Sequence, residues 1–318
     1  MNTNITKPSE QLQSAKLVAL PYSFISIQGA DAEKFLQGQV SCDLSKLDLN
    51  TFTYGTANTP KGRMYSLFKI AIWKEGYLLR LHNSISEQTF EALSKYKVFF
   101  KCIMALEEEF KAYGLLASGL DSLPVFSRYP EAFYALNRTQ DIILSRCATE
   151  QVMLELWSNT RSEVDASSEP QLVDEWFALE TQNGIPELYS QTADAFILQH
   201  LNLQELGAVS FNKGCYTGQE IIARMKFLGK LKKKCFLIKG SSQAKNPSKT
   251  KADPGSALFN AQGKKCGDLV RIHQLSNGDK FGLAILNVDF AERSESVFLN
   301  EALDIAFEVA ALNYNNGD

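Results

Sequence analysis

The chain has 318 residues, of which 45% are hydrophobic and 22% are charged, as in ordinary globular proteins. This length exceeds what one hydrophobic core usually serves, so we expect two or three domains. The net charge of −3 argues against a protein that coats nucleic acid over its whole surface, although it allows a local basic patch. No apolar segment approaches the roughly 20 residues of a membrane span, and residues 1–14 lack the apolar core of a signal peptide. We therefore expect a cytoplasmic protein with no membrane partner.

Cysteine and histidine are too scattered to predict a local metal site. The six cysteines form no C-x-x-C pair, and their spacings match neither a zinc site nor a disulfide framework. The three histidines are far apart in the sequence. We therefore expect no metal ligands and mostly reduced cysteines in the core. The cysteines are Cys42, Cys102, Cys147, Cys215, Cys235 and Cys266.

The first 117 residues alternate strand patterns with helix patterns. One helix begins near Asp31, and a capping box of Ser84 and Glu87 predicts a second helix through Tyr96. The predicted strands span residues 17–28, 52–57, 64–73, 77–81, 98–106 and 113–117. Strands, helices and hairpins in this order favour an α+β fold over a doubly wound sheet.

The rest of the chain divides near Gly229. Before it, the patterns predict short strands over 132–137 and 141–147, a helix over 149–158, and a helix over 173–183 that stops at Gly184. After it, β segments over 235–239, 269–273 and 281–286 are separated by a polar segment over 241–254. Their spacing predicts a small antiparallel barrel or sandwich.

The most unusual segment is Lys213-Gly-Cys-Tyr-Thr-Gly-Gln-Glu220. Its two glycines allow backbone conformations that are closed to other residues, or a close approach of a ligand. A cation such as Lys213 beside Cys215 favours the thiolate and would make the thiol reactive. The alternative is a turn into a helix in which Cys215 is a small buried hydrophobe and Glu220 pairs with Arg224 at i,i+4.

Other segments each carry a functional and a structural interpretation. Trp176 and Phe177 are either core or a platform for a flat heterocycle. Asn83 follows a strand directly before a helix, where polar groups either face a ligand or form a turn. Lys226 and the Lys230–Lys234 run either contact phosphates or are solvated. The phosphate-binding loops G-x-G-x-x-G and G-x-x-x-x-G-K-[ST] are absent.

The segment 213–220 resembles the signature of the YgfZ family, which comprises folate-binding proteins related to the aminomethyltransferase (T-protein) of the glycine cleavage system. Further similarity covers most of residues 17–290. It is carried by Gly29-Ala-Asp31, Phe35-Leu-Gln-Gly-Gln-Val40, Lys61-Gly-Arg-Met64, Tyr96-Lys-Val-Phe99, Gly184-Ile-Pro186, Gln204-Glu-Leu206 and Ala223-Arg-Met-Lys-Phe227.

The resemblance implies a ring of three domains around a cleft that holds tetrahydrofolate. Two ferredoxin-like α+β units would occupy residues 1–231, with a split near 112, and a β-barrel would occupy residues 232–318. The family is implicated in assembling or repairing iron–sulfur clusters, including that of a tRNA-thiomethylating enzyme. The implied partners are folate, iron–sulfur enzymes or assembly proteins, and tRNA.

The resemblance also implies the site residues. Tyr22 stands where the family often has Trp, and Gln182 stands at a position that is often acidic. The expected cofactor-binding residues are Tyr22, Asn83, Trp176, Gln182 and Tyr216. The expected functional thiol is Cys215, which Lys213, Glu220 and Arg224 would tune or orient.

Three functions follow from these observations. The leading hypothesis is a folate-dependent assembly or maintenance factor for iron–sulfur clusters. The second is a one-carbon (aminomethyl) transferase, against which Tyr65 and Ser66 argue, because they stand where the T-protein has its acidic pair and neither is a carboxylate. The third is a non-catalytic RNA or protein adaptor that uses the Lys230–Lys234 run.

Overall fold

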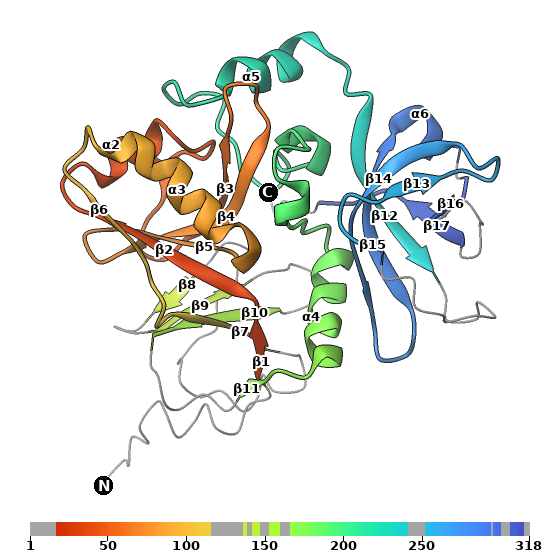
Figure 1. Cartoon of the computed structure of the whole chain (residues 1–318), viewed down its shortest axis with the longest axis horizontal. Helices are drawn as coiled ribbons and strands as arrows, with labels where there is room; N and C mark the ends of the chain where they lie inside the picture. The colour runs from red at the N-terminus through yellow and green to blue at the C-terminus, as the bar shows by residue number, and fades with distance from the viewer. Residues whose placement is uncertain are drawn as a thin grey trace, which may run out of the picture.

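Three β structures make up the molecule (Figure 1). They are a five-stranded sheet, a six-stranded sheet and a closed barrel of six strands, as counted over the residues that the structure describes. The structure, a computed structural model, describes residues 17–115, 136–138, 142–146, 153–159, 166–240, 252–293, 295–299 and 306–314. An α+β fold with a C-terminal barrel is therefore confirmed.

The five-stranded sheet is antiparallel and has the order β3-β4-β5-β2-β6. Its helices α2 (Ala32–Gln37) and α3 (Ser86–Lys97) lie on one face (Figure 1). On the other face, Phe24 packs against Trp157 of the second sheet. Because both faces are covered, the long central strand is buried along nearly its whole length. The strands are β2 (Tyr22–Gln28), β3 (Phe52–Asn58), β4 (Met64–Trp73), β5 (Gly76–His82) and β6 (Ile103–Leu106).

The six-stranded sheet has the order β11-β1-β7-β10-β9-β8. The predicted strand 17–28 is divided at Pro21 between this sheet and the first one, because proline cannot donate a ladder hydrogen bond. One stretch of extended chain thus joins the two sheets. The strands are β1 (Leu17–Leu20), β7 (Lys111–Leu115), β8 (Leu136–Arg138), β9 (Ile142–Arg146), β10 (Leu154–Ser158) and β11 (Ala166–Ser167).

Three local predictions are wrong. Residues 154–158 of the predicted helix 149–158 form strand β10, which pairs with both β7 and β9; this tertiary pairing overrides a helical pattern. Residues 149–152 lie outside the described part of the chain. Ser84 does not cap α3, because its hydroxyl contacts Nδ1 of His82 at 2.8 Å and the short helix η2 (Asn83–Ile85) comes first. The predicted strand 98–106 shortens to β6, because α3 continues through Lys97 and a turn follows it.

Helix α4 (Pro170–Gln182) connects the second sheet to the barrel. It contacts β1 on one side and β14 and β15 on the other. Trp176 is fully buried and packs on Gly114 of β7, where a Cβ would lie 2.5 Å from the indole ring. The helix ends before Gly184, whose φ of +70° suits glycine. The predicted helix over 173–183 is therefore confirmed, with one more turn at its start.

The barrel closes in the order β12-β15-β14-β13-β16-β17 and has a small core of its own. The remaining segment, between α4 and the barrel, contains η4 (Ser190–Thr192), η5 (Leu198–Leu201) and α5 (Gln219–Leu228). The barrel elements are β12 (Lys233–Gly240), β13 (Ala257–Phe259), β14 (Lys265–Gln274), β15 (Lys280–Asn287), α6 (Val288–Ala291), β16 (Val297–Phe298) and β17 (Ala306–Ala310).

A buried carboxylate holds the two sheets together. Glu155 of β10 is fully buried and forms ion pairs with Lys69 of β4 and with Arg80 of β5, whose Nε lies 2.8 Å from Oε1. It also accepts a hydrogen bond of 2.7 Å from Nε1 of Trp157. Burial would raise the pKa of Glu155, but Arg80 and Lys69 outweigh burial and lower it to about 2. Two cations from one sheet thus depend on one anion from the other.

We predict that Glu155→Gln lowers the free energy of unfolding by about 3–5 kcal/mol at pH 7, because it removes the buried anion that Lys69 and Arg80 share. Since the pKa of Glu155 is about 2 in the folded protein against 4.5 normally, this stabilisation is complete above pH 4.5 and disappears as the pH falls towards 2. The difference in free energy of unfolding between wild type and Glu155→Gln, measured by urea unfolding, should therefore become smaller as the pH falls from 4.5 towards 2. The exposed Glu87→Gln is the matched control, and an equal loss in that variant would contradict the prediction.

Candidate functional site

An aromatic and charged cluster lies where α4 meets the first sheet and the barrel. We call it the Phe177 cluster; its members are Tyr22, Phe177, Glu180, Arg271 and His273. The Phe177 ring lies 6.2 Å from the Tyr22 ring and 5.1 Å from the His273 ring, between centroids. The Arg271 guanidinium lies 5.1 Å from the Phe177 centroid. Residues from β2, α4 and β14 thus meet around one phenyl ring.

Arg271 fastens the barrel to α4. Its Nε donates to Oγ1 of Thr181 at 2.8 Å, and its Nη2 donates to the carbonyl of Phe177 at 2.7 Å and to Glu180 at 3.1 Å. Both Arg271 and Glu180 are 1% exposed. The ion pair is therefore formed almost without solvent, and it fixes the orientation of both side chains.

Several buried polar atoms of this cluster lack a hydrogen-bond partner among the described residues. They are Oη of Tyr22, Oε1 of Glu180, Nη1 of Arg271 and Nε2 of His273. Nε1 of the neighbouring Trp176 is also without a partner. Buried polar atoms are almost always hydrogen-bonded in folded proteins. Acceptors and donors left open around aromatic rings indicate a site for a polar, flat ligand.

The protonation states around the cluster favour neutral rings beside fixed charges. Burial, with Arg271 and Arg80, lowers the pKa of His82 to about 4. Burial also lowers the pKa of His273, although Nδ1 of that ring lies 2.6 Å from Asp174. Burial raises the pKa of Glu187, which pairs with Arg80 at 3.7 Å and lies beside the Tyr22 hydroxyl. Both imidazoles are therefore neutral at pH 7, while the two arginines carry the positive charge.

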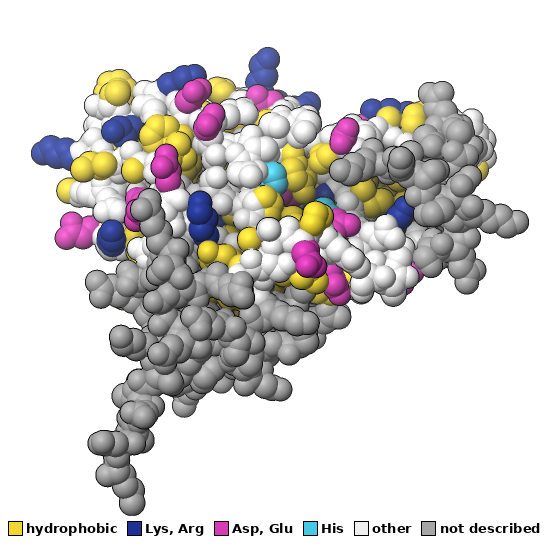
Figure 2. Space-filling model, turned by 60° about the horizontal axis from the view of Figure 1, so that its bottom comes forward, with side chains coloured by type: hydrophobic (Ala, Val, Ile, Leu, Met, Phe, Trp, Pro, Cys, Tyr) yellow, Lys and Arg dark blue, Asp and Glu magenta, His cyan; other side chains and the backbone are white. Residues whose placement is uncertain are grey.

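The surface is hollowed between the sheets and the barrel. Figure 2 shows histidine, arginine or lysine, and acidic side chains at the bottom of this hollow, between yellow apolar ones. Arg80 lies 3.7 Å from the centroid of the Tyr22 ring, and Tyr189 lies 4.7 Å from His82, between ring centroids. Further aromatic and charged side chains, those of Arg80, His82 and Tyr189, thus lie beside the Phe177 cluster.

The structure places the expected cofactor-binding residues in three different situations. Tyr22 belongs to the Phe177 cluster, and Trp176 is buried beside it. Gln182 is half-buried at the end of α4, and Asn83 is exposed one residue beyond β5. Tyr216 belongs to the signature segment, where it is buried near Lys213 and Cys42. The carboxylates that reach the cluster are therefore Glu180 and Glu187 rather than a residue at position 182.

The signature segment 213–220 is anchored elsewhere, on the region after α2 and on the β3–β4 hairpin. Nζ of Lys213 donates to the carbonyls of Val40 and Cys42 at 2.9 and 2.6 Å. Gly218 has a φ of +85°, and a Cβ there would lie 2.6 Å from the carbonyl oxygen of Thr59. The signature segment 213–220 thus lies beside the motif Lys61-Gly-Arg-Met64 of the hairpin, about 150 residues earlier in the chain. Figure 1 shows α5 next to this hairpin.

Cys215 is exposed, so the alternative in which it is a small buried hydrophobe is wrong. Of the described cysteines without a disulfide, the other four are buried; Cys147 lies outside the described residues. The thiol next to the Lys213 ammonium is that of Cys42, whose pKa burial nevertheless raises to about 12. Glu220 and Arg224 are exposed on α5 and form no ion pair within 4 Å in the described part of the molecule.

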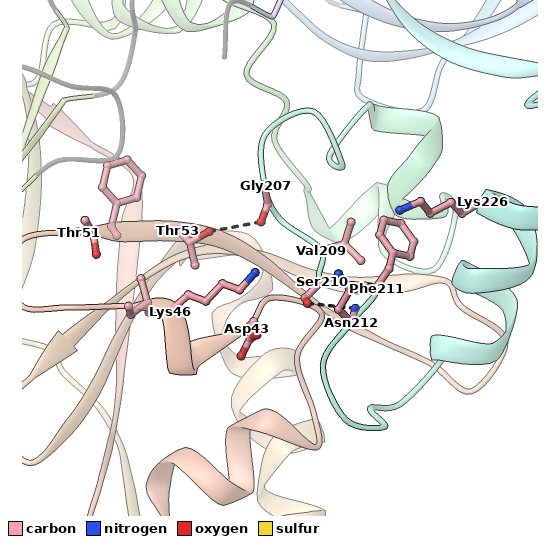
Figure 3. A pocket seen from close by; sticks show the side chains of 12 residues that line it. Asp43, Lys46, Thr51, Thr53, Gly207, Val209, Ser210, Phe211, Asn212 and Lys226 are labelled. Atoms are coloured by element: carbon pink, nitrogen blue, oxygen red, sulfur yellow. Dashed lines mark hydrogen bonds between the residues drawn. The ribbon is translucent and has the colours of Figure 1, made fainter. Parts of the chain in front are cut away.

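A cavity of about 490 Å³ opens next to the signature segment (Figure 3). It lies between the segment around η1 (Leu44–Lys46), strand β3, and residues 207–212. Lys46 and Lys226 both line it, and Nζ of Lys226 lies 3.8 Å from the centroid of Phe211. Neither lysine has an ion pair within 4 Å among the described residues, since Asp43 accepts instead from Gln37 and Ser45. The cavity can therefore accept an anionic group.

Sequence patterns alone did not predict the following site residues: Arg80, Glu180, Glu187, Arg271 and His273. One local signal was present, because Glu180 follows Phe177 at i+3 and so lies on the buried face of the same helix. The other four come from a strand, a loop and the barrel, which only the fold brings together. Within the described residues, no group of three or more His, Cys, Asp or Glu is arranged to hold a metal ion. None of the described helices is long and apolar enough to cross a membrane.

Comparisons with known proteins agree with this architecture. No protein-family model matches the chain. A protein from Aliivibrio fischeri named tRNA-modifying protein YgfZ is 30% identical over 280 residues, which cover 86% of this chain and 85% of that protein. A protein of the same name from Colwellia psychrerythraea is 28% identical over 307 residues, covering 92% and 94% of the two chains.

A solved structure shares the fold. The glycine cleavage system aminomethyltransferase T from Bartonella henselae aligns with 96% of this chain and 89% of its own, with a TM-score of 0.68 and 15% sequence identity. The same family is indicated by the signature segment, by the sequence identity to proteins from several organisms and by the shared fold. The chain belongs to the YgfZ family.

Proposed function

We propose that this protein binds a reduced folate at the Phe177 cluster and acts in the assembly or repair of iron–sulfur clusters, and thereby supports tRNA modification. The observation that carries the proposal is the set of buried polar atoms without partners around Phe177. The relatives' name, tRNA-modifying protein, supports the link to tRNA. The fold shared with an aminomethyltransferase supports a folate ligand.

The open atoms of the cluster fit a reduced pterin. A pterin ring is flat and carries amino and N–H donors together with a carbonyl acceptor. Oε1 of Glu180 can accept from the donors, and Nη1 of Arg271 can donate to the carbonyl. The rings of Phe177 and Tyr22 supply apolar surface beside these groups. Tetrahydrofolate would supply a one-carbon carrier or a reductant at this place.

The hairpin next to the signature does not favour aminomethyl transfer. Tyr65 and Ser66 are both buried on β4. Burial raises the pKa of Tyr65 well above the usual range, so its hydroxyl keeps its proton at neutral pH. Neither side chain can act as the carboxylate base that proton transfer there would require. We therefore propose a factor that binds folate without transferring an aminomethyl group.

Cys215 is the proposed functional thiol. It is exposed, and the segment that carries it is held on both sides by Lys213 and by the close approach of Gly218 to Thr59. A single thiolate cannot hold an iron–sulfur cluster in the usual four-cysteine manner. Thiol chemistry or transient handling, completed by a partner or an external thiol, is therefore the role that we propose for it.

We predict that Tyr22→Phe weakens tetrahydrofolate binding about three- to tenfold, because it removes one hydrogen bond to the ligand while the ring remains. The free energy of unfolding of the free protein should change by about 1 kcal/mol or less, since the Tyr22 hydroxyl lies beside Glu187 but forms no hydrogen bond of regular geometry among the described residues. Titration calorimetry under reducing conditions measures the affinity, and urea unfolding measures the stability. Tyr77→Phe, which also removes one tyrosine hydroxyl, is the matched control. Equal affinities of wild type and both variants would contradict a folate site at this cluster.

We predict that Cys215→Ala fails to restore the activity of an iron–sulfur tRNA-thiomethylating enzyme in cells that lack the native gene. The variant should fold and bind tetrahydrofolate like wild type, because the thiol is exposed and outside the Phe177 cluster. Cys266→Ala, which changes a buried thiol of the barrel, should restore the activity. Full restoration by Cys215→Ala would assign the thiol a structural role and favour the adaptor hypothesis.

A second candidate, direct contact with RNA, is favoured by the cavity between Lys46 and Lys226. Phe227, which is 68% exposed, and the exposed Lys230, Lys232 and Lys234 extend this basic surface along and beyond α5. Two uncompensated lysines beside exposed aromatic groups suit a phosphate backbone.

If RNA binds there, the double variant Lys46→Ala/Lys226→Ala should bind tRNA more weakly and should reduce the slope of log affinity against log salt by about 2. Filter binding between about 50 and 200 mM salt measures both effects. The control is Lys111→Ala/Lys239→Ala, which removes two exposed lysines elsewhere. Identical slopes for the two double variants would exclude this surface as the RNA contact.

A further inference from the structure

The exposed apolar side chains are concentrated at one place, at the end of the molecule away from the barrel. Seven large hydrophobic residues are exposed in the described part of the chain, and five of them lie between positions 96 and 106. Phe99 is 83% exposed, Ile103 73% and Val98 71%. The other two in this group are Tyr96 and Leu106. Large apolar side chains that are exposed together in one short segment indicate an interaction site.

The same segment contains a free sheet edge. Strand β6 is the last strand of its sheet and pairs only with β2 in the described structure (Figure 1). The amide of Glu107 donates to the carbonyl of Phe24 at 2.9 Å. By the alternation of an antiparallel ladder, Ile103 and Ala105 also direct their backbone groups to β2, whereas Met104 and Leu106 direct theirs outward. The edge therefore offers two residues whose N–H and C=O groups can pair with another strand.

Charges of opposite sign flank the edge. Lys95, Lys97 and Lys101 precede β6, and Glu107, Glu108 and Glu109 follow it. Figure 2 shows basic and acidic side chains around apolar ones at this end of the molecule. The strand is therefore basic at its beginning and acidic at its end. Two such strands side by side are complementary only when they run in opposite directions.

We propose that β6 is a self-association edge at which a second copy of this chain adds its own β6 in antiparallel orientation about a two-fold axis. Chain reversal places the basic segment of each copy beside the acidic segment of the other, so two complementary contacts form at once. The exposed side chains of Val98, Phe99 and Ile103 would be covered at the same time. The charge pattern favours a second copy over an unrelated strand. Each copy has a basic segment before β6 and an acidic segment after it, so two antiparallel copies match each other at both ends.

The short strand determines how strong this association is. With four residues, β6 adds few backbone hydrogen bonds to the interface, so the dimer is reversible and in equilibrium with the monomer. The proposal concerns a surface that is separate from the folate site and from Cys215, and it does not rest on the proposed function.

Sedimentation velocity of the full chain over about 1–100 μM tests the proposal through charge reversal. Lys101→Glu alone and Glu108→Lys alone should each raise the dimer dissociation constant about tenfold or more, because each places like charges at both contacts. An equimolar mixture of the two variants should dimerise like wild type. In the mixed dimer, both changed side chains meet at one contact with opposite charges, and the other contact is unchanged. Ile103→Glu should abolish the dimer. The exposed Leu49→Glu, an apolar-to-acidic change at a different place, should leave it intact.

The outcomes separate the alternatives. A wild-type chain that is monomeric throughout this range overturns the proposal, as does a dimer that Leu49→Glu weakens as much as Ile103→Glu. A mixture of the two charge variants that remains monomeric excludes the antiparallel arrangement. Circular dichroism of each variant confirms that it is folded; all the substituted side chains are exposed.

Discussion

The charge balance around Glu155 is the interaction on which the rest of the molecule depends. This one carboxylate lies between two sheets and forms ion pairs with both Lys69 and Arg80, which are buried. The cost of burying three ions is large, and their mutual attraction and the hydrogen bond from Trp157 help to offset it. Such a group specifies how the sheets face each other, because any sliding of one sheet separates the charges. The apolar contacts around it would tolerate such sliding more easily.

The same network reaches the candidate site. Arg80 places its guanidinium 3.7 Å from the centroid of the Tyr22 ring and approaches Glu187. Tyr22 in turn lies against Phe177, over which Arg271 reaches from the barrel. Two buried arginines, one from a sheet and one from the barrel, therefore hold the rings between them. These contacts therefore hold the cluster's buried polar atoms without partners in a fixed arrangement.

The sequence predicted those parts of the fold that depend on local patterns. The period-2 alternation identified the strands of the first sheet, and the spacing of short strands identified the barrel. Strand β10 was missed, because Glu155 interrupts an apolar run and its partner cations lie on strands 75 and 86 residues earlier. The resemblance predicts cofactor contacts at Tyr22 and Trp176, and the structure places Tyr22 in the Phe177 cluster and Trp176 beside it. Arg271 and His273 could not be predicted from any local pattern, since they act on α4 from a β-barrel strand about 90 residues later.

The signature segment shows how a motif can be structural and functional at once. Lys213 donates hydrogen bonds to two backbone carbonyls. Position 218 requires glycine, because the carbonyl oxygen of Thr59 lies where a Cβ would need space. Gly214, in contrast, has no atom within 4 Å of the place where a Cβ would stand. The anchors therefore hold the two ends of the segment while the thiol between them remains open to solvent. A thiol presented in this way is accessible to a large partner, whereas the polar atoms of the Phe177 cluster are buried. On the proposed function, folate and the iron–sulfur substrate would therefore meet the protein at different surfaces.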